Sequence, residues 1–168
     1  MIYQVGALQA FCDSYGVTLQ HMKLHGAFYN TACVTPALAD SVLDGLQAVN
    51  PNIAAMVLSG SYIAKEAQRR GIPVIQEVFA DRGYTDEGTL VPRTEPGAFI
   101  KDPQEALERV LMMVTEGKVI TNTGNTIDIV ADSVCVHGDN PEAIAFTNYI
   151  REGLTKAGVT VANFQNRK

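Results

Sequence analysis

The chain has 168 residues, of which 46% are hydrophobic and 18% charged, and this composition is typical of a folded globular domain. Its formal net charge of -5 and its scattered lysines and arginines argue against nucleic acid as a partner. No apolar stretch approaches the roughly 20 residues that a membrane span needs. Because residues 1–10 also lack the features of a signal peptide, we expect a cytoplasmic protein that forms one domain over residues 1–168.

The cysteines are three in number, Cys12, Cys33 and Cys135, and no two have C-x-x-C spacing. An odd count without that spacing argues against a disulfide framework and against a zinc knuckle. We therefore expect three free thiols.

In the first part of the chain, hydrophobic spacing predicts alternating helices and strands. In chain order these are a helix over residues 2–15, a strand over 17–24, a helix that starts at Pro36, a strand over 53–58, a helix over 61–70 and a strand over 73–79. Gly16 and Gly71 are suitable stops for the helices that precede them.

In the second part, Asp102 and Pro103 begin a capping-box helix that Gly117 ends. The remaining predicted elements are a ribbon of residues 118–121 and 126–130, a strand over 133–137, a helix bearing residues 143–154 and a final strand over 159–162. This alternation predicts an α/β fold with a parallel sheet and helices outside it. A closed eight-unit barrel takes about 250 residues, so the candidates are an open sheet, a small doubly wound domain or an incomplete barrel.

Polar and ionisable residues gather where three of the predicted strands end. Ligands of α/β proteins bind at the carboxyl ends of parallel strands, so we expect these residues to face one crevice that is an active site. The candidates are Lys23, His25, Tyr29 and Asn30 after the first strand, Glu77, Asp81, Arg82 and Arg93 around the second, and His137 and Asp139 after the third.

Several of these residues have competing structural interpretations. Glu77 lies in a strand that should be buried and needs a cationic partner, such as Lys23 or Arg82. Arg82 can form an ordinary loop ion pair, or it can bind a substrate carboxylate or phosphate together with Arg93. Asp139 can simply cap the helix that follows it.

The sequence has no phosphate-binding glycine loop, dinucleotide fingerprint, nucleophile elbow or H-E-x-x-H motif. Any nucleotide must be held by other means or by another chain. The histidines and aspartates at the strand ends permit a divalent metal but do not demand one.

Four ordered segments resemble the LamB/YcsF family, whose members are also called the 5-oxoprolinase A subunit. They are HMKLHGAFYN at 21–30, EVFADRGY at 77–84, LVPR at 90–93 followed by Gly97 and Ala98, and CVHGD at 135–139. The family usually has Pro in place of Leu24 and Leu in place of Phe28, and its N-terminal blocks have no counterpart here. The resemblance therefore implies an N-terminally truncated member that is inactive alone.

The resemblance further implies a seven-stranded parallel β/α barrel of the glycoside hydrolase and deacetylase type, here without its first strands. It implies an ATP-dependent opening of the 5-oxoproline lactam to glutamate, carried out with subunits B and C. In that scheme His25, His137, Asp81, Asp139 and Lys23 are catalytic, and the substrate-binding residues are Arg82, Arg93, Glu77, Asn30 and Tyr29.

Two other functions stay open at this point. The chain can be a non-catalytic binding or assembly piece of the family, with a homo-oligomer as one possible form. The barrel type alone also suggests a metal-dependent carbohydrate deacetylase, although fold is a weak guide to chemistry.

Overall fold

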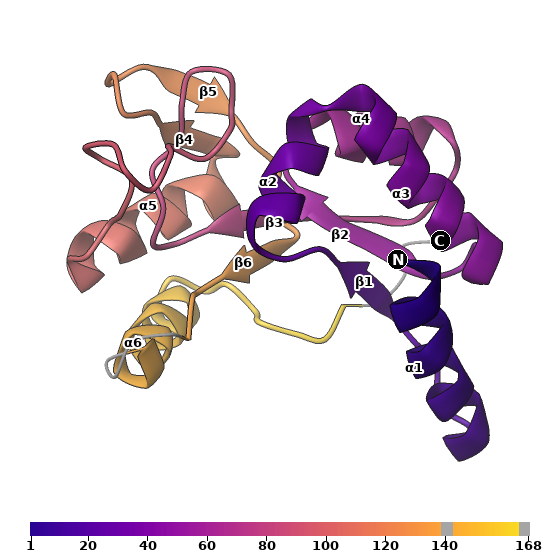
Figure 1. Cartoon of the computed structure of the whole chain (residues 1–168). Coiled ribbons are helices and arrows are strands. Elements are labelled where there is room, and N and C mark those ends of the chain that lie inside the picture. Colours follow the sequence, from indigo (N-terminus) through magenta and orange to yellow (C-terminus); the bar gives the residue numbers. More distant parts are fainter. Residues whose placement is uncertain (139–142, 165–168) are drawn as a thin grey trace. The chain divides into compact units, whose positions relative to one another are not determined.

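The computed structural model (Figure 1) describes residues 1–138 and 143–164. Helices alternate with parallel strands, which confirms the predicted α/β class. The residues group into two compact units, Met1–Gln76 and Glu77–Lys168, and each is described by itself. The interpretation of the chain as one domain stays a prediction.

The first unit is built from two parallel strands and four helices. Its elements are α1 (Ile2–Tyr15), β1 (His21–Lys23), α2 (Gly26–Val34), α3 (Pro36–Val49), β2 (Ala54–Leu58) and α4 (Tyr62–Arg69), followed by the start of β3 (Val74–Phe79). In the parallel pair of β1 and β2, His21 lies opposite Ala54 and Lys23 opposite Met56. The centre of this unit is apolar, with Leu43, Leu46, Ile53, Leu58 and Ile63 almost completely buried.

Local sequence signals explain where these helices begin and end. Gly16 ends α1 in the left-handed conformation at φ 64°, which costs glycine little. The Ser61 hydroxyl accepts a hydrogen bond from the Ala64 N–H and so caps α4. Pro36 occupies the first turn of α3, where its missing N–H is not needed.

Two predictions for the first unit need correction. The strand predicted over 17–24 is confined to His21–Lys23, and Val17 is exposed. Helix α2 is not predicted by the sequence, because its buried side chains, Tyr29, Ala32 and Cys33, span little more than one turn. So short an apolar stripe does not stand out in a sequence.

The second unit contains one parallel strand pair, one antiparallel ribbon and two helices among its described residues. Beyond β3 its elements are α5 (Pro103–Thr115), β4 (Lys118–Ile120), β5 (Thr126–Asp128), β6 (Ser133–Cys135) and α6 (Ala143–Lys156). β3 and β6 are parallel, with Glu77 opposite Ser133 and Phe79 opposite Cys135. β4 and β5 form the ribbon that the sequence predicted.

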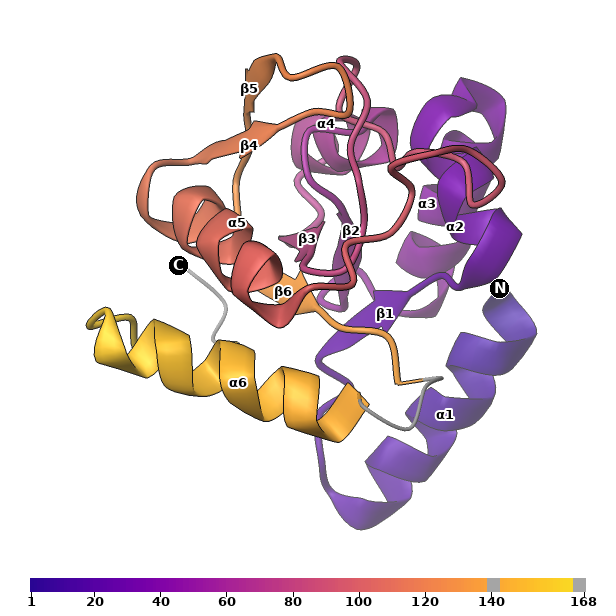
Figure 2. The same cartoon turned by 90° about the vertical axis from the view of Figure 1, so that its left-hand side faces the viewer.

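Helices α5 and α6 lie side by side (Figures 1 and 2) and share an apolar cluster. Its buried members are Ala80, Ala106, Val110, Ile150 and Leu154. The predicted cap of α5 is confirmed, because the Asp102 carboxylate accepts a hydrogen bond of 2.8 Å from the Glu105 N–H. The predicted strand over 159–162 is wrong. Residues 160–162 are exposed, and the backbone N–H of Val159 donates back to the Leu154 carbonyl at the end of α6.

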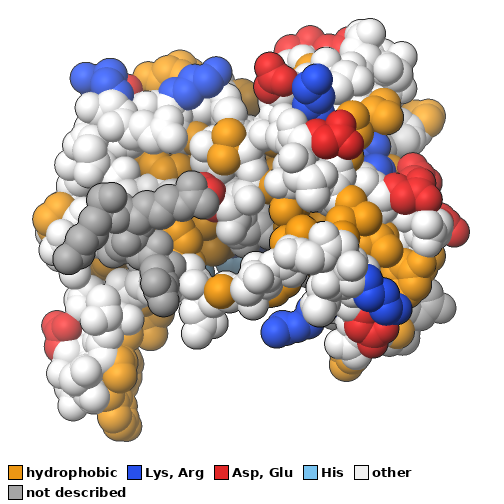
Figure 3. Space-filling view, turned by 180° about the vertical axis from the view of Figure 1, so that it is seen from behind, with side chains coloured by type: hydrophobic (Ala, Val, Ile, Leu, Met, Phe, Trp, Pro, Cys, Tyr) orange, Lys and Arg blue, Asp and Glu red, His pale blue; other side chains and the backbone are white. Residues whose placement is uncertain are grey.

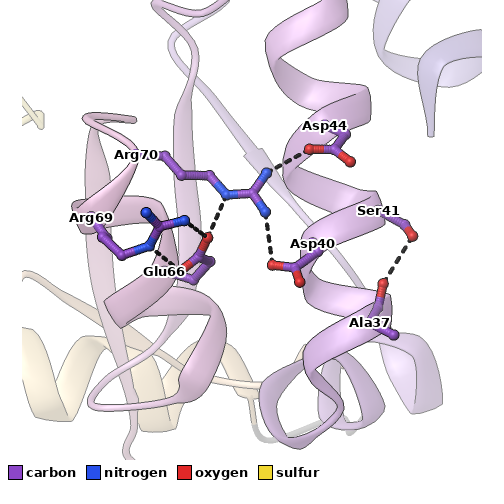
Figure 4. A network of polar contacts seen from close by, with 7 residues as sticks. All are labelled: Ala37, Asp40, Ser41, Asp44, Glu66, Arg69 and Arg70. Carbon is purple, nitrogen blue, oxygen red and sulfur yellow. Dashed lines mark hydrogen bonds and ion pairs between the residues drawn. The ribbon is translucent and has the colours of Figure 1, made fainter.

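A network of ion pairs joins α3 to α4 (Figure 4). Arg70 contacts three carboxylates, those of Asp40 at 2.7 Å, Asp44 at 2.5 Å and Glu66 at 2.6 Å. Glu66 is also held by two hydrogen bonds from Arg69, and these arginines lower the pKa of Glu66 to about 2. The network ties the two helices together.

Helix α1 exposes most of its large apolar side chains. Leu8, Phe11 and Tyr15 are 52%, 65% and 81% exposed, and Figure 3 shows hydrophobic side chains along one side of this helix at the lower left. Within the described residues, no helix is long and apolar enough to cross a membrane.

Candidate active site

The second unit contains a close contact between two of the predicted site residues, Asp81 and His137. The Nδ1 atom of His137 lies 2.6 Å from Oδ2 of Asp81, and the two side chains are 27% and 18% exposed, in that order. Both residues follow the parallel pair of β3 and β6, in which Phe79 lies opposite Cys135. Two residues further along each strand are Asp81 and His137, so the strand register itself brings them together.

The chemistry of the pair fixes the position of the imidazole proton. An ionised carboxylate only accepts hydrogen bonds, so Nδ1 of His137 carries the proton and its N–H donates a hydrogen bond to Oδ2 of Asp81. In the neutral imidazole, Nε2 is then the atom that can accept a proton from a reacting group. The other carboxylate oxygen of Asp81, Oδ1, is buried and has no hydrogen-bond partner among the residues that the structure describes.

An aromatic ring supports the imidazole from one side. Phe79 stacks on His137 with ring centroids 5.6 Å apart and an angle of 23° between the ring planes. Stacking and the carboxylate together restrict the two side-chain torsions of His137. Phe79 is not among the predicted site residues, because its contact with His137 depends on the register of β3 and β6, which places Phe79 opposite Cys135.

The segment that follows Asp81 is an ordered loop closed by backbone hydrogen bonds. The Gly83 N–H donates to the Ala98 carbonyl, and the Val91 N–H donates to the Gly83 carbonyl. A side chain at position 83 would put its Cβ atom 2.0 Å from the Gly97 carbonyl oxygen, so only glycine allows this approach.

Arg82 acts as a clamp within this loop. It is only 3% exposed, and it donates from Nε to the Ala98 carbonyl at 2.9 Å and from Nη2 to the Val91 carbonyl at 2.6 Å. Burial, followed by repulsion from Arg93, lowers the pKa of Arg82. These contacts give Arg82 a structural role, and the predicted substrate contact stays a prediction.

Arg93 has a different environment from that of Arg82, because it is exposed. Its guanidinium carbon lies 5.4 Å from the centroid of the Phe99 ring, and that of Arg82 lies 5.2 Å from the same ring. Phe99 therefore holds two cations by cation–π contacts. Arg93 is the member of this stack that can still reach a dissolved anion.

The candidates of the first unit are grouped around β1 and α2. The Lys23 ammonium lies 5.8 Å from the centroid of the Tyr29 ring, and Tyr29 is buried. His25 is exposed and is the residue that precedes α2, and Asn30 is exposed on that helix. These residues lie in a different unit from Asp81 and His137, so the predicted single crevice stays a prediction.

Glu77 and Asp139 are the two remaining predicted site residues. Glu77 is only 2% exposed, as its strand position predicts, and it does interact with other groups. Asp139 lies outside the described residues. Within residues 1–138 and 143–164, no three His, Cys, Asp or Glu side chains are placed to hold a metal ion, and all three cysteines are free, as predicted.

The chain is similar to known proteins both in sequence and in structure. The sequence profile of the LamB/YcsF family matches residues 1–168, and the chain belongs to that family. It is 56% identical to the 5-oxoprolinase A subunit of Fusobacterium nucleatum over 161 residues, and 46% identical to that of Brevibacillus brevis over 162 residues. Among solved structures it resembles a lactam utilization protein from Thermus thermophilus, with a TM-score of 0.87 and 40% sequence identity.

These matches span nearly all of this chain but only part of its relatives. The alignments cover 96% of the chain against 63% of the Fusobacterium protein and 64% of the Brevibacillus protein. The structural match covers 97% of the chain and 65% of the Thermus protein. The chain thus spans slightly less than two thirds of these relatives' length.

Proposed function

We propose that this chain is part of an ATP-dependent 5-oxoprolinase that opens the lactam of 5-oxoproline to give glutamate. The observation that carries the proposal is its 56% identity to a relative named as the A subunit of 5-oxoprolinase, within an aligned region that includes both Asp81 and His137. That relative is named as a subunit, which supports the proposal that this chain also acts with partner chains. We propose that these partners are subunits B and C and that the enzyme is cytoplasmic.

A lactam carbonyl is a poor electrophile, because the amide nitrogen donates electron density to it. ATP, when bound, would activate the lactam by phosphorylating the amide oxygen. The chain has no phosphate-binding glycine loop, so we propose that a partner chain contributes most of the ATP site.

The residues of this chain then handle the proton of the attacking water. Nε2 of His137 accepts that proton, and the carboxylate of Asp81 stabilises the imidazolium that results. Asp81 also keeps the imidazole in the tautomer that leaves Nε2 free. The same pair can return the proton to the lactam nitrogen as the ring opens.

The remaining candidates take supporting roles in this proposal. Lys23 stabilises developing negative charge, with His25 and Asp139 as further acid–base groups. Substrate binding falls to Arg82, Arg93, Glu77, Asn30 and Tyr29. We further propose that this chain forms part of a seven-stranded barrel of the glycoside hydrolase and deacetylase type, and that any divalent metal belongs at the strand ends of that barrel.

The test is glutamate release from 5-oxoproline and ATP, measured with subunits B and C present. His137→Gln should lower the rate by about 10²- to 10⁴-fold, the usual contribution of an acid–base group. His21→Gln is the matched control, because His21 lies on β1 in the first unit, with its Nδ1 atom 3.2 Å from the Gln20 side chain. A His137→Gln enzyme as active as the control would favour a binding or assembly role for the chain instead.

A further inference from the structure

Tyr84 is a phenol at the centre of the second unit that the proposed reaction does not use. It is 0% exposed, and burial raises the pKa of its hydroxyl well above the ordinary value. The group therefore stays neutral at physiological pH. A buried phenol needs a hydrogen-bond partner, and the identity of that partner indicates what the residue does.

The partner of the Tyr84 hydroxyl is the backbone of β3. The Phe79 N–H donates to the phenol oxygen at 2.9 Å, and this hydrogen bond is buried. The next amide of the strand, that of Ala80, donates instead to the Cys135 carbonyl of β6. Successive amides of a strand point to opposite sides, so Tyr84 holds the last residue of β3 on the side opposite β6.

Phe79 is also the residue whose ring supports the imidazole of His137. The backbone of Phe79 is held in position by Tyr84, and its side chain stacks on His137 at a centroid distance of 5.6 Å. Asp81, which holds Nδ1 of the same imidazole, lies only two residues further along the chain. Both supports of His137 therefore depend on the end of β3.

We infer that Tyr84 is a positioning residue, which sets the orientation of the His137 imidazole through the backbone and ring of Phe79. This inference rests on the proposed function for its kinetic consequence, but its structural content does not. A phenylalanine at position 84 would fill nearly the same volume and would take the phenol oxygen away from the buried Phe79 N–H. A buried N–H without an acceptor is destabilising, so we expect the backbone of Phe79 to shift until this N–H finds another partner.

The test uses the full chain with labelled histidine and records the ring signals by NMR. The chain has only three histidines, so His137→Gln assigns the signal of His137 directly. The stacked Phe79 ring shifts the His137 ring protons by its ring current. In Tyr84→Phe these protons should move toward unstacked positions, whereas the signals of His21 and His25 should stay in place.

The matched control is Tyr149→Phe in the same unit. The Tyr149 hydroxyl donates to the Gln104 side chain between α6 and α5, so this variant also loses one phenol hydrogen bond, away from His137. It should leave the His137 signal unchanged. Equal His137 shifts in the two phenylalanine variants would overturn the inference.

A kinetic measurement with subunits B and C provides the second readout. Tyr84→Phe should lower kcat by about 10- to 100-fold with KM nearly unchanged, because a displaced base affects the reaction more than binding. If Tyr84→Phe does not fold, Phe79→Leu removes the stacked ring and keeps the backbone N–H, and the same two changes are expected.

The two proposals fail in different ways. An unmoved His137 signal in Tyr84→Phe, together with a His137→Gln enzyme that is inactive, would contradict the positioning role alone. A His137→Gln enzyme that is fully active, together with a shifted His137 signal in Tyr84→Phe, would contradict the proposed function alone.

Discussion

The ion-pair network between α3 and α4 and the pair of Asp81 and His137 use similar side chains in opposite ways. In the network, Arg70 is shared by three carboxylates and Glu66 is shared by two arginines. In the pair, Asp81 has one oxygen without a partner in the described part of the chain, and His137 keeps its second nitrogen for another contact. In the network, the three guanidinium nitrogens of Arg70 all contact carboxylates, and such pairing stabilises a fold. In the pair, a buried carboxylate oxygen without a partner and the second imidazole nitrogen retain the capacity to bind or to transfer a proton.

Asp81→Asn should have the largest effect on activity, and it should show most clearly that the pair of Asp81 and His137 serves the reaction whereas the network serves stability. The amide can donate to Nδ1 of His137 and so favours the wrong tautomer, which should lower glutamate release by about 10²- to 10⁴-fold in the assembled enzyme. The melting temperature should change little, because the amide keeps the shape of the carboxylate and can still bond to His137. Asp40→Asn in the network is the control, with lower stability and full activity. Comparable activity losses in both variants would contradict the distinction between a stabilising network and a reactive pair.

Gly83→Ala tests how far stability depends on the close backbone approach in the loop that follows Asp81. The new Cβ atom would meet the Gly97 carbonyl oxygen at 2.0 Å, so backbone must shift. We expect a loss of about 1–3 kcal/mol, or about 2–4 °C in Tm for each kcal/mol, in a thermal melt.

Gly6→Ala provides the matched comparison for this substitution. A Cβ atom at Gly6 meets nothing within 4 Å, and the residue lies in helix α1. Alanine is the better helix former, so Tm should rise or stay constant. A stable Gly83→Ala variant would mean that the loop can adjust without strain.

Within the network, the two arginines should differ in their effect on stability. Arg70 is 17% exposed and contacts three carboxylates, whereas Arg69 is 72% exposed and contacts that of Glu66. Arg70→Gln should lower Tm by about 2–4 °C, and Arg69→Gln by no more than about 1 °C. Thermal melts at low and high salt measure both. Equal Tm changes in the two variants would show that the buried contacts of Arg70 add no stability beyond that of an exposed ion pair.

The smallest effect concerns the pH dependence of stability. Glu66 has a pKa of about 2 in the folded chain, against an ordinary value of 4.5. Its contribution is therefore complete above pH 4.5 and is lost as the pH falls toward 2. The Tm difference between the wild type and Glu66→Gln should shrink across this range. A Tm difference that stays constant as the pH is lowered through this window would contradict the lowered pKa of Glu66.

The sequence predicted most of this fold because its helices carry strong local signals. Asp102, Ser61 and Gly16 define helix ends through contacts with their own neighbours, and such contacts are visible in the sequence. The errors fall where burial depends on distant residues. The predicted strand over 159–162 has apolar residues that stay exposed, and α2 buries too few residues to show a period.

The candidate site was predicted in part, for a related reason. Asp81 and His137 are predicted site residues because each follows a strand, and the structure brings them into contact. Their support by Phe79 and Tyr84 depends on strand register and on a loop that turns back to the strand, and neither is encoded in local spacing. The charge of Arg82 predicts a contact with an anion, whereas the structure shows its guanidinium bonded to two backbone carbonyls, and the sequence gives no local signal for those bonds.

The closure of the loop by its own backbone has a consequence for amide hydrogen exchange. The N–H groups of Gly83 and Val91 both donate hydrogen bonds across the loop. The Arg82 side chain also donates to the carbonyls of Ala98 and Val91. Neither amide can reach solvent by a small local fluctuation, because the two bonds and the clamp must open together. The loop should therefore exchange its protected amides at one common rate, as a single cooperative unit rather than as a flexible connection.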